Sequence, residues 1–471
     1  MRCSLFLHQA AKVLPQKTIG FRSLAQPLPT HIPSPERQRR NAEDLAKLRR
    51  AQAQALEGGG IKGRARHASK GKLPVRERVS ALLDPPEEFL ELGLLAGLGM
   101  PYGDIAAAGL VAGVGRVSGR LCMVAGHDAT VKGGAIFPIS LRKTLRVQQI
   151  AATLRLPFIW LVDTGGAYLP LQSEIFLPGG RTFYNQAIMG AAGIPQIAVV
   201  CGNCTAGGAY TPTMCDDVVM VRGLGSMFLG GPPLVKAATG QEVGVEELGG
   251  AAVHCAESGG ADYLAEDEAE ALAAVRDIIS CLPPPNATVP STSGEDKPPL
   301  RSEQELDGLL GCGLSGPPFA YQVLSRIVDE SAFSEFRARY GSALVCGYAR
   351  IAGQLLGVLF GTGEVMDAKS AQKGSQFLQM LHLRQQPALF VQNGPSSPTS
   401  DFCNLRASAA LVAAVANFSP PKISLTVGDC SGAQLPAQCG LGLEPWLSVS
   451  WPGVSVTDDM NNSHDSIREW H

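Results

Sequence analysis

The sequence predicts an α/β fold of two related domains, in each of which ββα units stack into a superhelix. Three observations support this prediction. Strand-like apolar runs alternate with helix-like segments along most of the 471 residues, which indicates parallel βαβ units. The pattern of these runs occurs twice along the chain. Glycine-rich turns follow the strand-like runs of the first half, at the strand ends where α/β domains bind ligands.

The internal repeat is clearest in the first β-rich run of each half. Residues Gly109–Gly126 contain the motif GRVSGRL, and residues Ala343–Gly361 contain ARIAGQL. Each half continues with a helix, a buried strand after a proline, a second helix and a second strand. In the first half these are expected at 137–155, Phe158–Asp163, 181–192 and Gln196–Gly202, and in the second at 370–385, Ala388–Asn393, 405–417 and Lys422–Gly428.

Composition shifts divide the chain into segments. We expect a first domain over 36–285, a proline-rich linker over 286–302 and a second domain over 303–471. A charged helix over 37–56 is expected to stop at the glycines 58–60. Residues 1–35 contain no Asp or Glu and carry basic residues among Ser and Leu, which is typical of a mitochondrial transit peptide and predicts the matrix as destination. A disordered tail is the alternative.

Charge and composition argue against several classes of partner. The formal net charge of −2 gives no support for nucleic-acid binding, which needs a basic surface. No apolar run is long enough for a membrane span. The twelve cysteines are scattered, and the single C-x-x-C, Cys201 and Cys204, lacks the second pair that a zinc site needs. We therefore expect no metal, and a redox pair stays a minor alternative.

Paired glycines after strands are the main chemical signal. The sequence contains no H-E-x-x-H, G-x-S-x-G or Walker A motif. A glycine turn at a strand end can instead point two backbone N–H groups at one oxygen, as in an oxyanion hole, which a thioester enolate requires. Glycine permits positive φ and close approach of a ligand. Tight packing between turn and helix is the competing interpretation, but three such turns at successive strand ends favour function.

Six segments carry a resemblance to a known family: KLPVRERVSALLDP at 72–85, DATVKGGA at 128–135, LVDTGGAYLP at 161–170, GRTFYNQAIM at 180–189, CTAGGAY at 204–210 and GGPPLVKAATG at 230–240. They resemble the carboxyltransferase (beta) subunits of biotin-dependent acyl-CoA carboxylases. The tyrosine and proline of GGAYLP are similar to the methylcrotonoyl-CoA carboxylases, since propionyl-CoA enzymes carry an arginine after the alanine. The likeness is dense over about 40–280 and weaker over about 300–430.

The resemblance implies two domains of the ClpP/crotonase superfamily. The first would bind the acyl-CoA and the second the biotin, the two coming from opposite subunits of a dimer within a larger assembly. Biotin would be carried by a partner alpha subunit, which uses ATP and bicarbonate. The implied function is transfer of CO2 from carboxybiotin to an acyl-CoA, most closely 3-methylcrotonyl-CoA of leucine degradation. Backbone N–H groups would hold the enolate, and biotin would supply the base.

The resemblance also assigns site residues. The catalytic oxyanion turn would be Ala206, Gly207 and Gly208. The acyl-CoA pocket would be lined by Lys132, Gly133, Gly134, Gly165, Gly166, Ala167, Tyr168, Thr205, Gly230 and Gly231. Within this set Tyr168 would shape the acyl end. Lys132 would meet a CoA phosphate, or be an ordinary solvated lysine, and Thr205 would alternatively cap the helix that follows.

The second half departs from the family pattern. The family's biotin-side turn Y-G-A-G aligns with Ser431, Gly432, Ala433 and Gln434, so a glutamine stands in place of the last glycine. Asp458 and Asp459 stand where the family has two glycines. The second domain also stops sooner than the first, so we expect it to be incomplete.

Three functions stay open at this stage. The first is a working carboxyltransferase subunit. The second is a catalytically impaired member that binds acyl-CoA or the carboxylase assembly without turnover. The third is a crotonase-type acyl-CoA hydratase or hydrolase, for which Asp163 is the evident carboxylate in the first domain.

Overall fold

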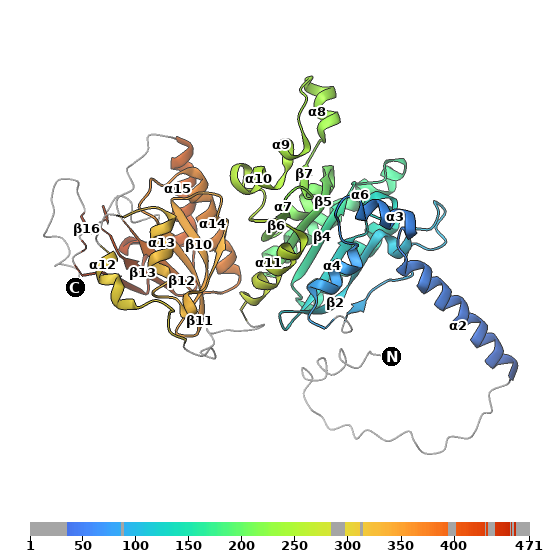
Figure 1. The fold of residues 1–471 in the computed structure, drawn as a ribbon, viewed down its shortest axis with the longest axis horizontal. Helices are drawn as coiled ribbons and strands as arrows, with labels where there is room; N and C mark the ends of the chain where they lie inside the picture. The colour runs from blue at the N-terminus through green and yellow to red at the C-terminus, as the bar shows by residue number, and fades with distance from the viewer. Residues whose placement is uncertain are drawn as a thin grey trace, which may run out of the picture. The chain divides into compact units, whose positions relative to one another are not determined.

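The computed structural model describes residues 35–85, 89–283, 297–310, 314–393, 402–428, 430–431, 439–452, 454 and 456–457. The chain divides into two compact units, Met1–Ala51 and Gln52–His471. Helix α2 (Pro35–Leu56) begins in the first unit, and its residues are mostly exposed. The second unit holds the predicted second domain and the predicted first domain from Gln52 onward, with every feature discussed below (Figure 1). No helix in the described ranges has both the length and the apolar character of a membrane span.

The first β-sheet has the order β1-β2-β3-β4-β5-β6-β8, with β7 paired to β5. The strands are β1 (Leu90–Glu91), β2 (Leu110–Val117), β3 (Arg120–His127), β4 (Phe158–Thr164), β5 (Gln196–Thr205), β6 (Asp217–Val221), β7 (Ser226–Phe228) and β8 (Tyr263–Ala265). The β1–β2 and β2–β3 pairs are antiparallel, and all others are parallel. The carboxyl ends of β3, β4 and β5 therefore lie at one edge of the sheet, where a ligand site is expected.

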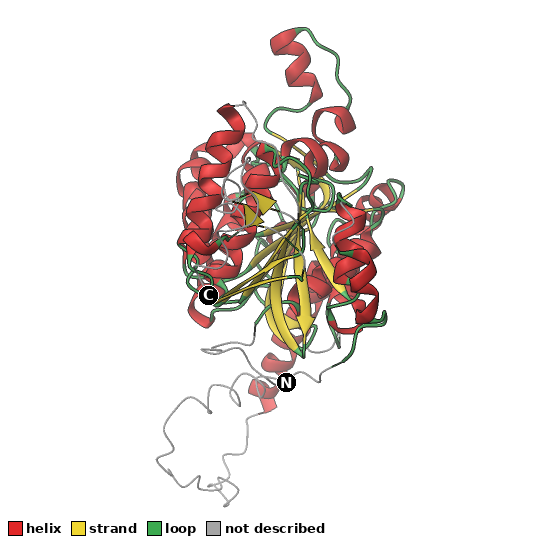
Figure 2. Cartoon of the chain, turned by 90° about the vertical axis from the view of Figure 1, so that its left-hand side faces the viewer, coloured by secondary structure: helices red, strands yellow, loops and turns green. Residues whose placement is uncertain are grey.

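Helices cover both faces of this sheet (Figure 2). The helices α5 (Pro138–Leu154) and α6 (Gln172–Ala191) pack on one face, and α4 (Val75–Leu82) and α11 (Glu268–Ser280) pack on the other. Strand β4 shows why: Trp160 and Val162 belong to the first core, whereas Ile159 and Leu161 belong to the second. Parallel strands that are buried on both faces read as continuous apolar runs, which is the pattern that predicted them.

The second sheet repeats the first, with the order β15-β13-β12-β11-β10-β9. Its strands are β9 (Phe333–Phe336), β10 (Leu344–Ile351), β11 (Gln354–Gly361), β12 (Ala388–Gln392), β13 (Lys422–Thr426) and β15 (Leu447–Ser450). Its helices are α12 (Leu306–Leu309), α13 (Pro317–Leu324), α14 (Ala368–Leu383) and α15 (Phe402–Ala416). The remaining elements are α3 (Gly60–Ala68), α7 (Tyr210–Thr213), α8 (Pro232–Thr239), α9 (Val245–Gly249), α10 (Ala251–Val253), β14 (Cys430–Ser431) and β16 (Val456–Thr457).

The predicted internal repeat is confirmed in atomic detail by the two β-hairpins. The β2–β3 and β10–β11 hairpins share one register, in which Arg116 and Arg350 each face the leucine two residues beyond the turn glycine. An aspartate accepts two backbone N–H bonds from each turn, Asp84 at 3.0 and 2.6 Å and Asp329 at 2.9 and 2.7 Å. The domain boundaries themselves stay predictions.

Two expectations about helices need correction. The helix predicted over 181–192 is α6, which begins at Gln172 and runs through Pro178. The Pro-Gly-Gly at 178–180 hid the first turns of this helix from the sequence analysis, and Ile175, which is 4% exposed, is buried within them. The glycines 58–60 do follow the end of α2, but Gly60 also opens α3. A Cβ on Gly59 would lie 1.9 Å from the carbonyl oxygen of Thr130, so this glycine also allows close approach of two backbones.

A buried arginine joins the two repeats within the second unit. Arg384 follows α14, and its Nη2 lies 2.8 Å from Oδ2 of Asp217 on β6. Its Nη1 donates to the hydroxyl of Tyr348 at 2.6 Å. The side chains of Arg384 and Asp217 are 4% and 0% exposed. A charge pair buried this deeply is costly to break from one side, because the other charge is left in a low-dielectric interior.

We therefore expect Arg384→Met to lower the free energy of unfolding by about 3 kcal/mol. Urea denaturation followed by tryptophan fluorescence measures it. Asp217 would keep the hydrogen bond from the Tyr263 hydroxyl at 3.3 Å, but it would lose its ion pair with Arg384. The double variant with Asp217→Asn should recover part of the loss. A loss in the double variant equal to the sum of the losses in Arg384→Met and Asp217→Asn would show that the pair is not coupled.

Candidate active site

The site is built around an irregularity in the pairing of β4 with β5. Val162 pairs with Val200 and Thr164 pairs with Cys204, so β5 has two more residues than β4 in this interval. The side chain of Asp163 fills the space that the bulge creates. A Cβ on Gly202 would lie 1.9 Å from Oδ1 of Asp163. Bulges are frequent next to active sites because they re-aim the residues that follow.

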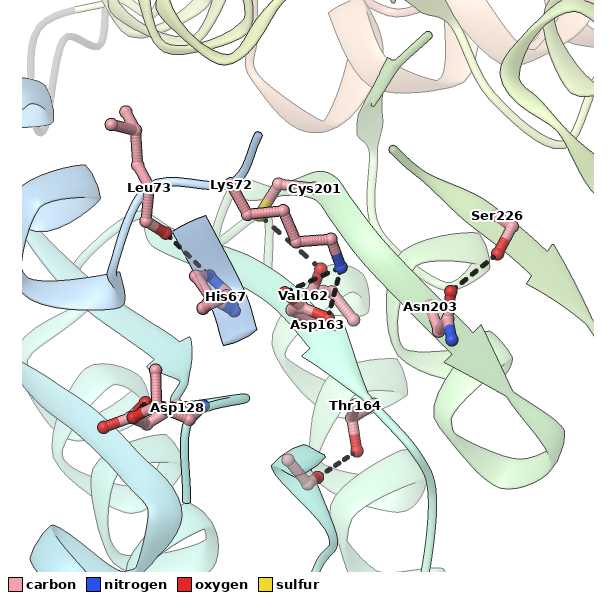
Figure 3. Close-up of polar contacts among 12 residues, drawn as sticks. His67, Lys72, Leu73, Asp128, Val162, Asp163, Thr164, Cys201, Asn203 and Ser226 are labelled. Atoms are coloured by element: carbon pink, nitrogen blue, oxygen red, sulfur yellow. Dashed lines mark hydrogen bonds and ion pairs between the residues drawn. The ribbon is translucent and has the colours of Figure 1, made fainter. Parts of the chain in front are cut away.

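Asp163 belongs to a buried cluster of two cations and two carboxylates. Figure 3 shows Lys72 and Asp163 of this cluster. The Nζ of Lys72 lies 3.0 and 3.1 Å from its two oxygens, and Nη1 of Arg78 lies 3.5 Å away. Arg78 also binds Glu268, with 3.1 Å between its Nε and Oε1. The four side chains are between 1% and 9% exposed. A carboxylate held in this way is not placed to accept a proton from a water, so this geometry disfavours Asp163 as the base of a hydratase.

Glycine turns lie at the ends of β3, β4 and β5, and the turn after β4 lies next to each of the other two. The first turn is Lys132–Gly134, the second runs from Gly165 to Tyr168, and the third is the 3₁₀ turn Ala206–Ala209. The second is tied to the chain after the first, since Ile136 N–H donates to the carbonyl of Gly166 at 2.8 Å. A Cβ on Gly166 would lie 3.3 Å from the carbonyl oxygen of Thr205. The structure thus brings together most of the predicted site.

The glycines of these turns fall into two groups. Some are required by packing: a Cβ on Gly134 would lie 2.4 Å from the carbonyl oxygen of Asp163, and one on Gly208 would lie 2.9 Å from Cγ2 of Thr164. Gly207 is different. It is exposed, its φ is not positive, and the nearest described atom to a Cβ would be Cζ of Phe183 at 3.9 Å. Neither backbone conformation nor packing within the described chain requires a glycine at 207.

The backbone donors available at the site follow from these turns. Gly207 lies in the first turn of a 3₁₀ helix, where N–H groups have no intrahelical partner. The N–H of Gly166 is already used, because it donates to Oγ1 of Thr164 at 3.1 Å. The N–H of Ala167 donates no hydrogen bond within the part of the chain that the structure describes. Gly207 and Ala167 are therefore two candidate backbone donors for an oxyanion, one on each turn.

A polar cleft of about 300 Å³ lies beside the first turn. Lys132 lines it and is exposed, with a φ of 50°. The cleft is lined by Gln54, Gly58, Gly59, Leu98, Asp104, Ala106, Thr130, Val131 and Lys132. This position is compatible with a lysine that meets a phosphate at the mouth of a site.

The other predicted pocket residues lie as follows. Tyr168 stacks on Phe137 with ring centroids 4.6 Å apart and is 37% exposed. The expected role of Thr205 as a helix cap is wrong, because its side chain makes no capping hydrogen bond. Gly230 and Gly231 lie between β7 and α8, and added Cβ atoms would meet Leu234 and Phe228 of their own segment.

The predicted biotin-side residues are not placed by the structure. Gly432, Ala433 and Gln434, together with Asp458 and Asp459, lie outside the described residues.

The C-x-x-C motif is not a redox pair. Cys201 belongs to the core under α4 and α11, whereas Cys204 belongs to the core on the opposite face of the sheet. Burial raises the pKa of the Cys201 thiol to about 12 and raises that of Cys204 as well. Within the described ranges, no three His, Cys, Asp or Glu side chains gather as metal ligands.

Four residues of the site were missed as functional by the sequence analysis: Lys72, Arg78, Thr164 and Glu268. Lys72 and Arg78 lie in the first family-like segment, at 72–85, but nothing in that segment indicates that they meet a carboxylate on β4. Thr164 follows Asp163 directly, but the sequence signal for function lay in the glycines that come after it, and nothing local indicates a role for the threonine.

His127 gives the site region a pH dependence. It ends β3, stacks with Trp160 at 6.1 Å, and burial lowers the pKa of its imidazole to about 4. The unfolded chain binds the proton near pH 6.5, so folding is favoured above that pH and disfavoured as pH falls toward 4.

We expect His127 to reduce the free energy of unfolding by about 2 kcal/mol between pH 7 and pH 5. His127→Gln should abolish that part of the pH dependence. Urea denaturation of both proteins at pH 7, 6 and 5 measures it, and parallel pH profiles of the two would contradict it.

Comparison with known proteins places the chain in a family. Residues 66–455 match the carboxyl transferase domain, so the chain belongs to the carboxyl transferase domain family. It is 42% identical over 426 residues to a mitochondrial methylcrotonoyl-CoA carboxylase beta chain of Arabidopsis thaliana, covering 88% of this chain and 72% of that protein. It is 44% identical over 425 residues to the biotin-dependent 3-methylcrotonyl-coenzyme A carboxylase beta1 subunit of Mycobacterium tuberculosis, covering 88% and 79%. The resemblance found in the sequence is thereby confirmed.

A solved structure confirms the fold. The transcarboxylase 12S hexamer with hydrolysed methylmalonyl-coenzyme A matches with a TM-score of 0.78 and 27% identity, over 88% of this chain and 82% of that one. Together with the repeated sheets, this confirms the predicted crotonase-like α/β fold.

Proposed function

We propose that this chain is the carboxyltransferase subunit of a biotin-dependent acyl-CoA carboxylase and that its substrate is 3-methylcrotonyl-CoA. One observation carries the site: Gly207 is exposed at the end of β5, and no described atom lies closer than 3.9 Å to the position of an added Cβ. A glycine without a packing or conformational reason is best explained by close approach of a ligand. The names of the two relatives support the substrate.

The proposed mechanism uses backbone donors on the acyl-CoA side. The N–H groups of Gly207 and Ala167 would bind the thioester oxygen and hold the negative charge of an enolate, which preorganised donors stabilise strongly. Tyr168, fixed on Phe137, would bound the acyl chain. Lys132 and the cleft beside it would bind a phosphate of CoA.

Biotin, carried by a partner subunit, would supply the carboxyl group and the base. The predicted biotin-side turn lies outside the described residues, so no step is assigned to its side chains. ATP and bicarbonate would be used by the partner.

The cellular setting is also proposed from the relatives. The Arabidopsis protein and those of Drosophila melanogaster and Dictyostelium discoideum are named mitochondrial, which supports a matrix location and a transit function for 1–35. The hexamer of the transcarboxylase core supports a homo-oligomer. We place the acyl-CoA domain at 36–285, the linker at 286–302 and the biotin-side domain at 303–471.

The second candidate is a subunit that binds acyl-CoA without turnover, which Gln434 and the aspartates at 458 and 459 favour. Fixation of ¹⁴C-bicarbonate into 3-methylcrotonyl-CoA tests both. The chain is co-expressed with a biotin-carrying alpha subunit and assayed with ATP, with and without avidin. Avidin-sensitive fixation establishes the carboxyltransferase. CoA-ester binding without fixation establishes the second candidate, and hydration or hydrolysis of the ester establishes a crotonase-type enzyme.

A further inference from the structure

Thr164 is the last residue of β4, and its hydroxyl connects two of the glycine turns. Figure 3 shows one of its two hydrogen bonds. Oγ1 donates to the carbonyl oxygen of Gly134 at 2.7 Å and accepts from the N–H of Gly166 at 3.1 Å. The residue is 1% exposed, so both bonds are shielded from water. The first turn is thus tied to the second by one hydroxyl group.

The methyl group of Thr164 contacts the third turn. A Cβ on Gly208 would lie 2.9 Å from Cγ2 of Thr164, so the backbone of that turn rests against the methyl. Thr164 also pairs with Cys204 across β4 and β5. The thiol of Cys204 donates to the carbonyl of Gly208 at 2.9 Å, which fixes the same turn from below.

The orientation of Thr164 is fixed from both sides. Hydroxyl and methyl are attached to one Cβ, and a β-branched side chain in a strand has restricted χ1. The preceding residue, Asp163, is held by Lys72 and Arg78. One torsion angle therefore sets how the turn that carries the Ala167 N–H lies relative to the turn that carries the Gly207 N–H.

We propose that Thr164 is a positioning residue that sets the spacing of the two backbone donors of the oxyanion site. This inference rests on the proposed function and deepens it. Thr164 is buried beneath the turns and does not touch the substrate. Thr164 acts through Gly166, from whose N–H its hydroxyl accepts a hydrogen bond. It also acts through Gly208, against which its methyl group packs. Loss of the hydroxyl releases the N–H of the Gly165–Gly166 peptide, so that, within the described chain, the turn before Ala167 is held only by the bond from Ile136 N–H to the Gly166 carbonyl. Loss of this alignment lowers the rate more than the affinity.

Four variants test the proposal in the complex with a biotin-carrying subunit: Thr164→Val, Thr164→Ser, Gly208→Ala and the double variant T164S/G208A. Valine keeps the shape and removes the hydrogen bonds, and serine does the reverse. We expect Thr164→Val to lower kcat for acyl-CoA carboxylation roughly tenfold or more with KM changed less than about threefold, and Thr164→Ser to lose less. Gly208→Ala should lose kcat through its clash, and the double variant should regain part of it because serine lacks Cγ2.

Unchanged kcat in Thr164→Val, or a double variant no better than Gly208→Ala, overturns the proposal. Should Thr164→Val fail to fold, the Gly208→Ala pair still decides. Amide hydrogen exchange of 165–168 and 206–209 gives a readout without activity, and we expect faster exchange of 165–168 in Thr164→Val than in Thr164→Ser. If the wild-type complex fixes no bicarbonate into acyl-CoA, the proposed function is refuted. If Thr164→Val and Thr164→Ser show equal amide hydrogen exchange over 165–168, the role of Thr164 is refuted.

Discussion

Gly207→Ala is expected to lower kcat/KM for acyl-CoA carboxylation by about 10²-fold while it changes the free energy of unfolding by less than about 0.5 kcal/mol. The added methyl meets nothing closer than Cζ of Phe183 at 3.9 Å among the described atoms, and φ at 207 is not positive. The fold therefore accepts alanine. The methyl would stand where the thioester oxygen approaches the Gly207 N–H, so the donor stays present but out of reach.

Steady-state kinetics of the complex with a biotin-carrying subunit and urea denaturation of the same preparation measure the two effects. Gly179→Ala is the matched control, because Gly179 lies in helix α6 with no atom within 4 Å of an added Cβ and no positive φ. It should keep full activity and gain some stability, as Gly→Ala does at compatible positions. Full activity in Gly207→Ala would remove the main support for the site.

The paired sheets could be predicted because the signal is local and repeated. Strand β4 is apolar on both faces, as Ile159 and Trp160 show, and its counterpart β12 has the same place in the second sheet. The hairpin motifs around Arg116 and Arg350 share a register. Such patterns follow from burial and turn geometry and need no knowledge of distant contacts.

The roles of individual glycines could not be predicted in the same way. Gly207 and Gly208 are adjacent in sequence, yet one is open and the other rests on Thr164. The difference depends on which side chain of a neighbouring strand lies beneath, and no local pattern carries that information. Packing and function are therefore not alternatives for the whole turn: packing accounts for Gly208, and the proposed function accounts for Gly207.

Asp163 shows a second limit. A carboxylate at a strand end is a reasonable candidate for a general base, and the position of Asp163 in the sequence alone favours that role. Its partners Lys72 and Arg78 come from a segment far away in sequence, before β2, and Glu268, which binds Arg78, lies at the start of α11. Ion pairs of this kind leave no periodic signal. Burial together with two cations turns a candidate catalyst into a structural anchor.

Arg78→Met is expected to lower the free energy of unfolding by about 4–5 kcal/mol, the largest stability effect predicted for this chain. Arg78 is 1% exposed, binds Glu268 and lies 3.5 Å from Asp163. Methionine fills a similar volume, so the loss comes from charge and not from a cavity. The cluster would change from two cations and two carboxylates to one cation and two carboxylates in a buried space. Urea denaturation at pH 7 measures the loss.

Two controls separate charge from packing. Arg222→Met breaks the exposed pair with Glu266, and it should leave the urea midpoint nearly unchanged because surface pairs contribute little. The double variant of Arg78→Met with Glu268→Gln restores one cation to one carboxylate, so its loss should be smaller than the sum of the two single losses. If Arg78→Met shifts the midpoint no more than Arg222→Met, the cluster does not anchor β4. Thr164 would then lack the fixed neighbour on which the spacing of the glycine turns depends.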